Sequence, residues 1–279
     1  MRLFRPSGIL GFATALAVVG GCASAGQVST QQEEQIGAQE AAQINQQIPL
    51  VQDAAINSYI NQLGRSIAQR ADPRGIPYTF RVVNSDVVNA FSIPGGYVYV
   101  DRGLISHTKN MSELAGVLAH EIGHVVERHG IEQMANAQNA NTALGLGTLI
   151  ADVLLGQGAA QATQTLGQVG GTAVLAKYSR QDEEEADLDA VRYLIHSGID
   201  PHGLVTMFQT LLQEEQSNPG AVAQWFATHP TTQDRITYVQ SAINQYSASQ
   251  LRGLSVQSQA YERMKQRLAQ LPPAPPSRQ

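Results

Sequence analysis

Two histidines lie four residues apart inside an apolar segment, and a glutamate directly follows the first of them. The segment runs from Ser112, which we expect to cap a helix, to Arg128, and its apolar residues recur at helical spacing. Residues four apart share one helix face, so His120 and His124 project the same way with Glu121 beside them. Two imidazoles and a neighbouring carboxylate are the ligands and the base of a hydrolytic zinc site. The pattern therefore predicts a helix that carries a metal centre.

Zinc lowers the pKa of a bound water to near neutrality and polarises a scissile carbonyl group, and Glu121 would take the proton and pass it to the leaving amine. The alternative is a surface helix with two solvated histidines. The chain has only 7 histidines among 279 residues, so this spacing rarely arises by chance. We therefore interpret the motif as the centre of a zinc-dependent hydrolase.

A catalytic zinc needs a third protein ligand, and the nearest histidine has the wrong spacing. His129 follows His120 by nine residues, whereas the metzincin pattern requires ten, with a glycine where Glu127 stands. We therefore expect His129 to lie at the C-terminal end of the helix, before Gly130, near the last carbonyl groups.

An acidic run at residues 182–187 offers a better ligand. Glu183 and Asp187 share a helix face, so Glu183 can bind the metal while Asp187 accepts the ring N–H of a ligand histidine. Such a run is more often a solvated acidic surface. Because an H-E-x-x-H helix precedes it, we predict that Glu183 is the third ligand.

The N-terminus carries an export signal. Residues 1–21 contain two arginines, no acidic residue, and an apolar run at residues 9–19 that is too short to span a bilayer comfortably. The following Val19-Gly20-Gly21-Cys22 resembles a bacterial lipobox, which predicts a lipid on Cys22. A free or buried thiol is the alternative. Cys22 is the only cysteine, so the chain forms no intramolecular disulfide.

The rest of the chain divides into a tether, a main domain and a tail. We expect a tether at 22–47 that becomes helical near the body, a domain at 48–245, and a C-terminal helix with a Pro-rich tail at 246–279. Residues 140–176 suit a soluble helical excursion better than a membrane hairpin, since Asp152 and Gln157 interrupt their apolar stretch. Further helices are expected at 48–70, 181–197, 204–216, 235–242 and 258–270, and strands at 78–83 and 96–100.

Composition limits the partners. With 43% hydrophobic and 15% charged residues, the chain can bury a full core. Its formal net charge of −5 argues against nucleic acid or an anionic membrane surface as the main partner.

The motifs together resemble family M48 of the gluzincin zinc metallopeptidases. The stretches that carry the resemblance are His120 to Gly130, Tyr178 to Arg180 leading into Glu183-x-x-x-Asp187, Asn89 to Gly96, and Thr228-His229-Pro230 followed by Arg235. They cover roughly residues 48–242 in the family's order. The resemblance implies an α+β, mostly helical, zincin-like fold with a small β-sheet and the H-E-x-x-H helix at the active site.

It also implies residue roles. One zinc ion per chain would be held by His120, His124 and Glu183, with Glu121 as the base and Asp187 supporting a ligand histidine. Asn89, Ala90 and the strand after Gly96 would line a cleft in which a peptide substrate adds as another strand. Arg235 is a possible support of the site.

His229 has two possible roles in this reading. It could donate a hydrogen bond to the oxyanion of the tetrahedral intermediate. It could instead occupy the open position on zinc and hold the enzyme inactive until substrate displaces it.

The leading hypothesis is a zinc endopeptidase of the bacterial cell envelope that removes misfolded or misassembled proteins. Its polypeptide substrates would meet it at a membrane to which the lipid anchors it, facing the periplasm, and it could work with the envelope assembly machinery. Ala23 after the lipidated cysteine, where inner-membrane lipoproteins carry Asp, favours the outer membrane of a Gram-negative source. The alternatives are a chaperone or assembly factor for outer-membrane proteins with a mostly closed metal site, and an amidase acting on cell-wall peptides.

Overall fold

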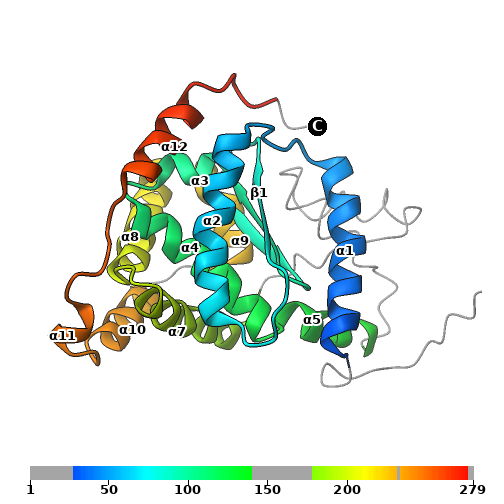
Figure 1. Ribbon diagram of the computed structural model, residues 1–279, viewed down its shortest axis with the longest axis horizontal. Coiled ribbons are helices and arrows are strands. Elements are labelled where there is room, and N and C mark those ends of the chain that lie inside the picture. Colours follow the sequence, from blue (N-terminus) through cyan, green and yellow to red (C-terminus); the bar gives the residue numbers. More distant parts are fainter. Residues whose placement is uncertain (1–27, 140–177, 231–232, 276–279) are drawn as a thin grey trace, which may run out of the picture.

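The computed structural model describes residues 28–139, 178–230 and 233–275, in which helices surround a small sheet (Figure 1). The helices are α1 Thr30–Gln47, α2 Ala54–Ala71, α3 Arg102–His107, α4 Met111–Val126, α5 His129–Asn139, α7 Arg180–His196, α8 His202–Ser217, α9 Pro219–Thr228, α10 Gln233–Ile243, α11 Ala248–Leu251 and α12 Gln259–Ala269. The strands are β1 Thr79–Val83, β2 Ala90–Ile93 and β3 Tyr97–Asp101. The expected α+β, mostly helical architecture with a small sheet is confirmed.

Several sequence predictions lie outside these residues. They are the signal peptide at 1–21, the lipid on Cys22 and the helical excursion at 140–176. Within the described part of the chain, none of the helices combines the length and apolarity needed to cross a bilayer.

The sheet has the order β1-β3-β2, with β1 and β3 parallel and β2 and β3 antiparallel. The sequence did not predict β2, because all four of its residues are buried and no alternation marks it. Gly95 and Gly96 have positive φ angles of 78° and 84° and turn the chain from β2 into β3. Because β3 has neighbours on both sides, a peptide could add to the described sheet only at an edge strand, and of the two edges β2 has the contacts with α4. The cleft along β2 and β3 stays a prediction.

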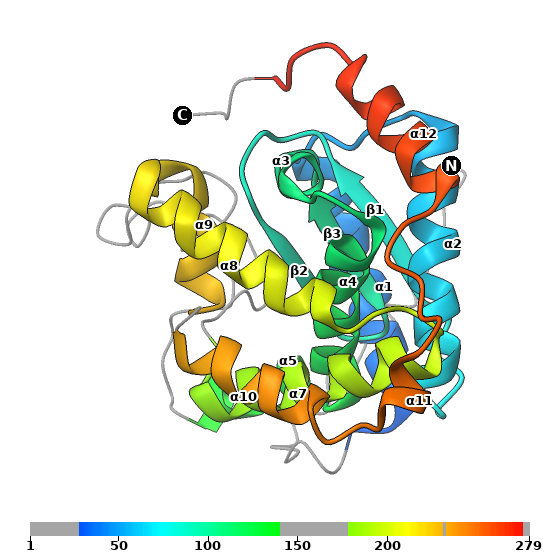
Figure 2. The same cartoon turned by 90° about the vertical axis from the view of Figure 1, so that its left-hand side faces the viewer.

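Helix α4 lies at the centre of the molecule, and all its residues except the last are buried. It packs on β2 and β3 and contacts α7 and α8; in Figure 2, α8 crosses in front of it. Gly123 permits the approach of α7, since an added Cβ would lie 3.0 Å from the Ala186 backbone. The predicted cap at Ser112 is wrong: Asn110 accepts the Glu113 N–H, and the Ser112 hydroxyl donates to Asn110.

Helix α1 lies on the other face of the sheet from α2 (Figure 1). Alternation along β3 explains this, because Val98 and Val100 join the core with α2 while Tyr99 joins a smaller core with α1. Residues 30–47 were expected to be part of a tether that becomes helical near the body; in the structure they form a helix that packs on the sheet. Its buried residues are mostly small or polar, namely Glu33, Gly37, Glu40, Ala41 and Ile44, so the sequence lacks an apolar stripe.

Candidate metal centre

Four buried side chains from three helices converge on one point. His120 and His124 come from α4 and Glu183 from the first turn of α7. His229 is the C-cap residue that directly follows α9. One potential ligand atom of each lies within 4.8 Å of all the others. The two histidine Nε2 atoms are 3.1 Å apart, and the Glu183 carboxylate lies 3.5 Å from the Nε2 of His124 and 3.7 Å from that of His120. The structure thus brings together the three predicted ligands and His229.

Asp187 and Arg235 orient His120. The Asp187 carboxylate lies 2.8 Å from His120 Nδ1, so it can accept that N–H and leave the Nε2 lone pair directed at the other ligands. Arg235 donates to both Asp187 oxygens at 2.8 Å and also to Glu183, and the Tyr238 hydroxyl donates to Asp187 at 2.6 Å. The geometry fits the predicted supporting roles of Asp187 and Arg235, and it adds Tyr238, which the sequence did not point to.

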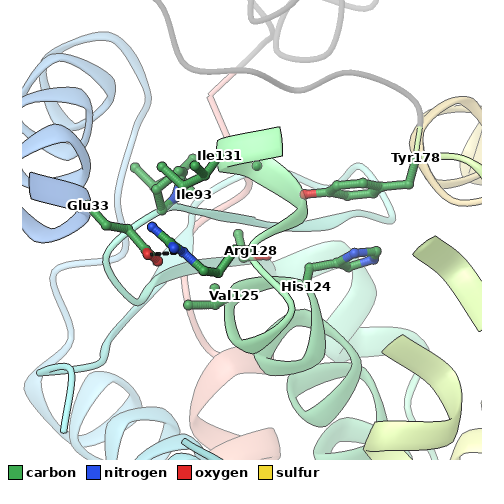
Figure 3. Close-up of a pocket in the computed structure, with 10 residues that line it drawn as sticks. Glu33, Ile93, His124, Val125, Arg128, Ile131 and Tyr178 are labelled. Atoms are coloured by element: carbon green, nitrogen blue, oxygen red, sulfur yellow. Dashed lines mark hydrogen bonds and ion pairs between the residues drawn. The ribbon is translucent and has the colours of Figure 1, made fainter. Parts of the chain in front are cut away.

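A second chain of contacts orients His124. Its Nδ1 lies 2.8 Å from His129 Nδ1, and His129 Nε2 lies 3.3 Å from a Glu185 carboxylate oxygen. Protons on His124 Nδ1 and His129 Nε2 satisfy both contacts and again leave the His124 Nε2 lone pair for the site. Tyr178 stacks on the His124 ring with centroids 3.7 Å apart, and Figure 3 shows its ring above that of His124.

The prediction that His129 ends the H-E-x-x-H helix is wrong. Arg128 has a φ of 62°, in the left-handed region that interrupts a helix, and His129 begins α5. This turn brings the His129 ring back towards His124. No local pattern predicts this turn, because Arg128 is not a residue type that favours a positive φ.

Glu121 lies beside the ligands and is held at one oxygen. The Ser92 hydroxyl of β2 donates to its Oε2 at 2.9 Å, while its Oε1 lies 3.4 Å from His229 Nε2. Ser92 was not among the predicted site residues, although it lies two residues beyond the predicted pair. Asn89 and Ala90 are buried at the start of β2 and do not join the ligand group, so their role in substrate binding stays a prediction.

The charges of the buried site favour a divalent cation. Glu121, Glu183 and Asp187 are opposed by the single guanidinium of Arg235, which leaves a formal charge of −2 in a region closed to solvent. Burial raises the pKa of Glu183, but His229 and Arg235 outweigh it and hold that pKa well below its usual range. Burial lowers the pKa of His229, but Glu183 and Glu121 outweigh it and raise that pKa. The same negative field would attract Zn²⁺, whose preferred imidazole and carboxylate ligands are in place.

Comparison with known proteins identifies the family. The sequence pattern of Peptidase family M48 matches residues 54–243, which include all the ligand positions. The chain belongs to this family. Its M48 region contains the H-E-x-x-H helix, the acidic helix and Arg235, so the resemblance inferred from the motifs is confirmed.

Curated relatives of this M48 chain include three proteases. It is 31% identical to the beta-barrel assembly-enhancing protease of Escherichia coli over 81% of this chain and 46% of the relative. It is 31% identical to the metalloprotease YcaL of the same species over 61% of this chain and 63% of the relative. It is 26% identical to the mitochondrial metalloendopeptidase OMA1 of Schizosaccharomyces pombe over 65% of this chain and 51% of the relative. The chain therefore spans about half the length of the first of these relatives.

Proposed function

We propose that this M48 protein is a zinc-dependent endopeptidase. The observation that carries the proposal is the placement of Glu121, which lies beside the three ligands and is held through only one of its oxygens by Ser92. A carboxylate so placed can accept a proton at Oε1 and later return it, which is what peptide hydrolysis requires of a general base.

The chain's own residues account for the proton transfers. A zinc ion held by His120, His124 and Glu183 would supply a Lewis acid and an activated water. Glu121 takes up the proton at Oε1 as the nucleophile attacks the scissile carbonyl, and then donates it to the leaving amine nitrogen. Ser92 keeps Oε2 occupied, so the carboxylate presents the same oxygen in both steps.

His229 supports a second proposal, that the resting site is closed. Its Nδ1 lies 3.2 Å from His120 Nε2 and 2.9 Å from Glu183 Oε1, within the ligand group itself. A residue at that distance can fill the fourth position on the metal. The alternative is that His229 donates to the oxyanion after moving off the metal, and its nearness to Glu121 is compatible with that role.

We further propose that the enzyme works in the bacterial envelope, anchored by a lipid on Cys22 and facing the periplasm, with misassembled proteins as substrates. The signal-like N-terminus and the lipobox support the location. Similarity to a protease named for β-barrel assembly supports outer-membrane proteins as substrates or partners. A chaperone with a closed metal site and a cell-wall amidase are the competing functions.

Substitution of the base tests the activity. Glu121→Gln keeps the shape of the side chain and removes its basicity, so casein cleavage should fall roughly 100- to 10,000-fold while about one zinc ion per chain is retained. A parallel digestion of peptidoglycan separates peptidase from amidase. Casein cleavage by Glu121→Gln at the wild-type rate would refute the assignment of the base. If the Glu121→Gln variant cleaves nothing but keeps the full biological effect of the wild-type protein, the result would favour the chaperone function.

A further inference from the structure

Glu33 of α1 is a fully buried carboxylate outside the residues that match the family. Arg128 donates to it from Nε at 2.8 Å, Arg74 from Nη1 at 3.2 Å, and the backbone N–H of Gly95 at 3.4 Å. These three residues follow α4, α2 and β2 respectively, so one side chain ties α1 to three elements. Figure 3 shows Glu33 and Arg128 on the opposite side of a pocket from His124 and Tyr178.

Both arginines also contact the end of the metal-binding helix. Arg74 donates from Nη2 to the carbonyl oxygen of Val125, the residue after His124, at 2.8 Å. Arg128 holds the left-handed turn between α4 and α5 that directs His129 towards His124. A non-glycine residue in this conformation costs about 1–2 kcal/mol, so it needs contacts that hold it there. Glu33 provides such a contact.

A second path joins α1 to the base. A Cβ added to Gly37 would lie 1.9 Å from the carbonyl oxygen of Pro94, so the α1 backbone lies directly against the turn after β2. Pro94 follows Ser92 by two residues, and Ser92 holds Glu121. Displacement of α1 would therefore disturb the base as well as a ligand.

We infer that α1 supports the active site and that Glu33 is a positioning residue, which sets the orientation of His124 and Glu121 without touching substrate. The inference rests on the proposed function. It concerns only this chain's residues, and the absorption spectrum of a bound metal ion tests it independently of turnover.

Two variants of the full-length chain test the inference by different routes. Glu33→Gln removes the charge and keeps the shape, whereas Gly37→Ala forces α1 away from Pro94 and leaves the charge in place. The matched controls are Glu34→Gln, which removes a carboxylate charge at the next position of α1, and Ala38→Ser, which adds one heavy atom at an exposed position of α1. Each protein is loaded with Co²⁺ for its visible absorption spectrum, and with zinc for kcat and KM on a peptide substrate.

We expect both test variants to bind about one metal ion per chain and to show an altered Co²⁺ spectrum. Their kcat should fall about 10-fold with little change in KM, as is typical when a contact that orients a metal ligand is lost. The controls should match the wild type. A merely structural role would instead lower metal content and kcat together and leave the spectrum of the bound Co²⁺ unchanged, and that result would overturn the inference.

Two other outcomes are decisive. Wild-type spectra and kcat in both test variants would also overturn the inference. If the wild-type protein cleaves no peptide, the proposed function fails, and the Co²⁺ spectra still decide whether α1 sets the geometry of the site.

Discussion

Two networks of carboxylates and arginines lie near the C-terminal half of α4, and they differ in charge. Around Glu33, two carboxylates (with Asp72) meet two guanidinium groups, Arg74 and Arg128, so that network is balanced by its own residues. At the metal centre, among the described residues, three carboxylates (Glu121, Glu183 and Asp187) meet a single guanidinium group, that of Arg235, which pairs with Glu183 and Asp187.

The two networks also differ in their access to water. The side chains of Arg74 and Arg128 are 19% and 27% exposed, whereas that of Arg235 is 4% exposed. A balanced, partly hydrated network serves to join helices. A fully buried network with an excess of negative charge favours the binding of a further cation, because an uncompensated buried charge is costly. The difference indicates which of the two acidic clusters binds metal.

The largest effect on stability should follow from removing the arginine of the metal centre. Arg235→Met leaves Asp187 and Glu183 without their buried partner, which should reduce the free energy of unfolding by about 3–5 kcal/mol. Arg128→Met is the matched change in the other network and should cost only about 1 kcal/mol, since water reaches that group. Urea unfolding of both variants measures the two losses in the free energy of unfolding. Equal losses would remove the distinction between the networks.

His229→Ala at the negatively charged metal centre separates the two proposed roles of His229. If His229 stabilises the oxyanion, kcat should fall roughly 100- to 1000-fold with zinc content unchanged. If His229 closes the resting site, basal proteolysis should rise instead. Initial rates on casein together with metal analysis separate the two roles, and a variant with wild-type turnover and zinc affinity would exclude both.

Glu40 shows a third way in which a buried carboxylate is accommodated, namely as the neutral acid. Burial raises the pKa of Glu40 from 4.5 to about 7 in the folded protein. Between these values the folded state binds more protons than the unfolded state, so stability falls as the pH rises from about 4.5 to 7 and is level above that. The full loss amounts to about 3 kcal/mol. Unfolding at pH 5 and pH 8 should show it in the wild type and not in Glu40→Gln; an unchanged pH dependence in the variant would assign it to another group.

The sequence predicted the part of the site that depends on helical spacing. His120, Glu121 and His124 follow from one helix face, Glu183 and Asp187 from another, and the structure brings the two faces together. The convergence of these side chains was predictable because i, i+4 spacing fixes direction without knowledge of the tertiary fold, and their catalytic roles stay predictions.

The contacts that depend on tertiary structure were missed. Ser92 lies on a short, fully buried strand without alternation, and His129 turns back only because Arg128 adopts a left-handed conformation. Helix α1 packs through glycine, alanine and two buried glutamates, so its composition resembles that of a spacer. Local patterns do not encode these features, because each is stabilised by partners distant in the sequence.

The most direct test of the account is to measure the zinc content of single variants of the chain. In each variant, a carboxylate of one network is neutralised. Elemental analysis should find about one zinc ion per chain in the wild type, in Glu33→Gln and in the exposed-site control Glu184→Gln, and far less in Glu183→Gln. Zinc-free wild-type protein, or a Glu183→Gln protein that binds zinc as well as the wild type does, would contradict the assignment of the metal centre.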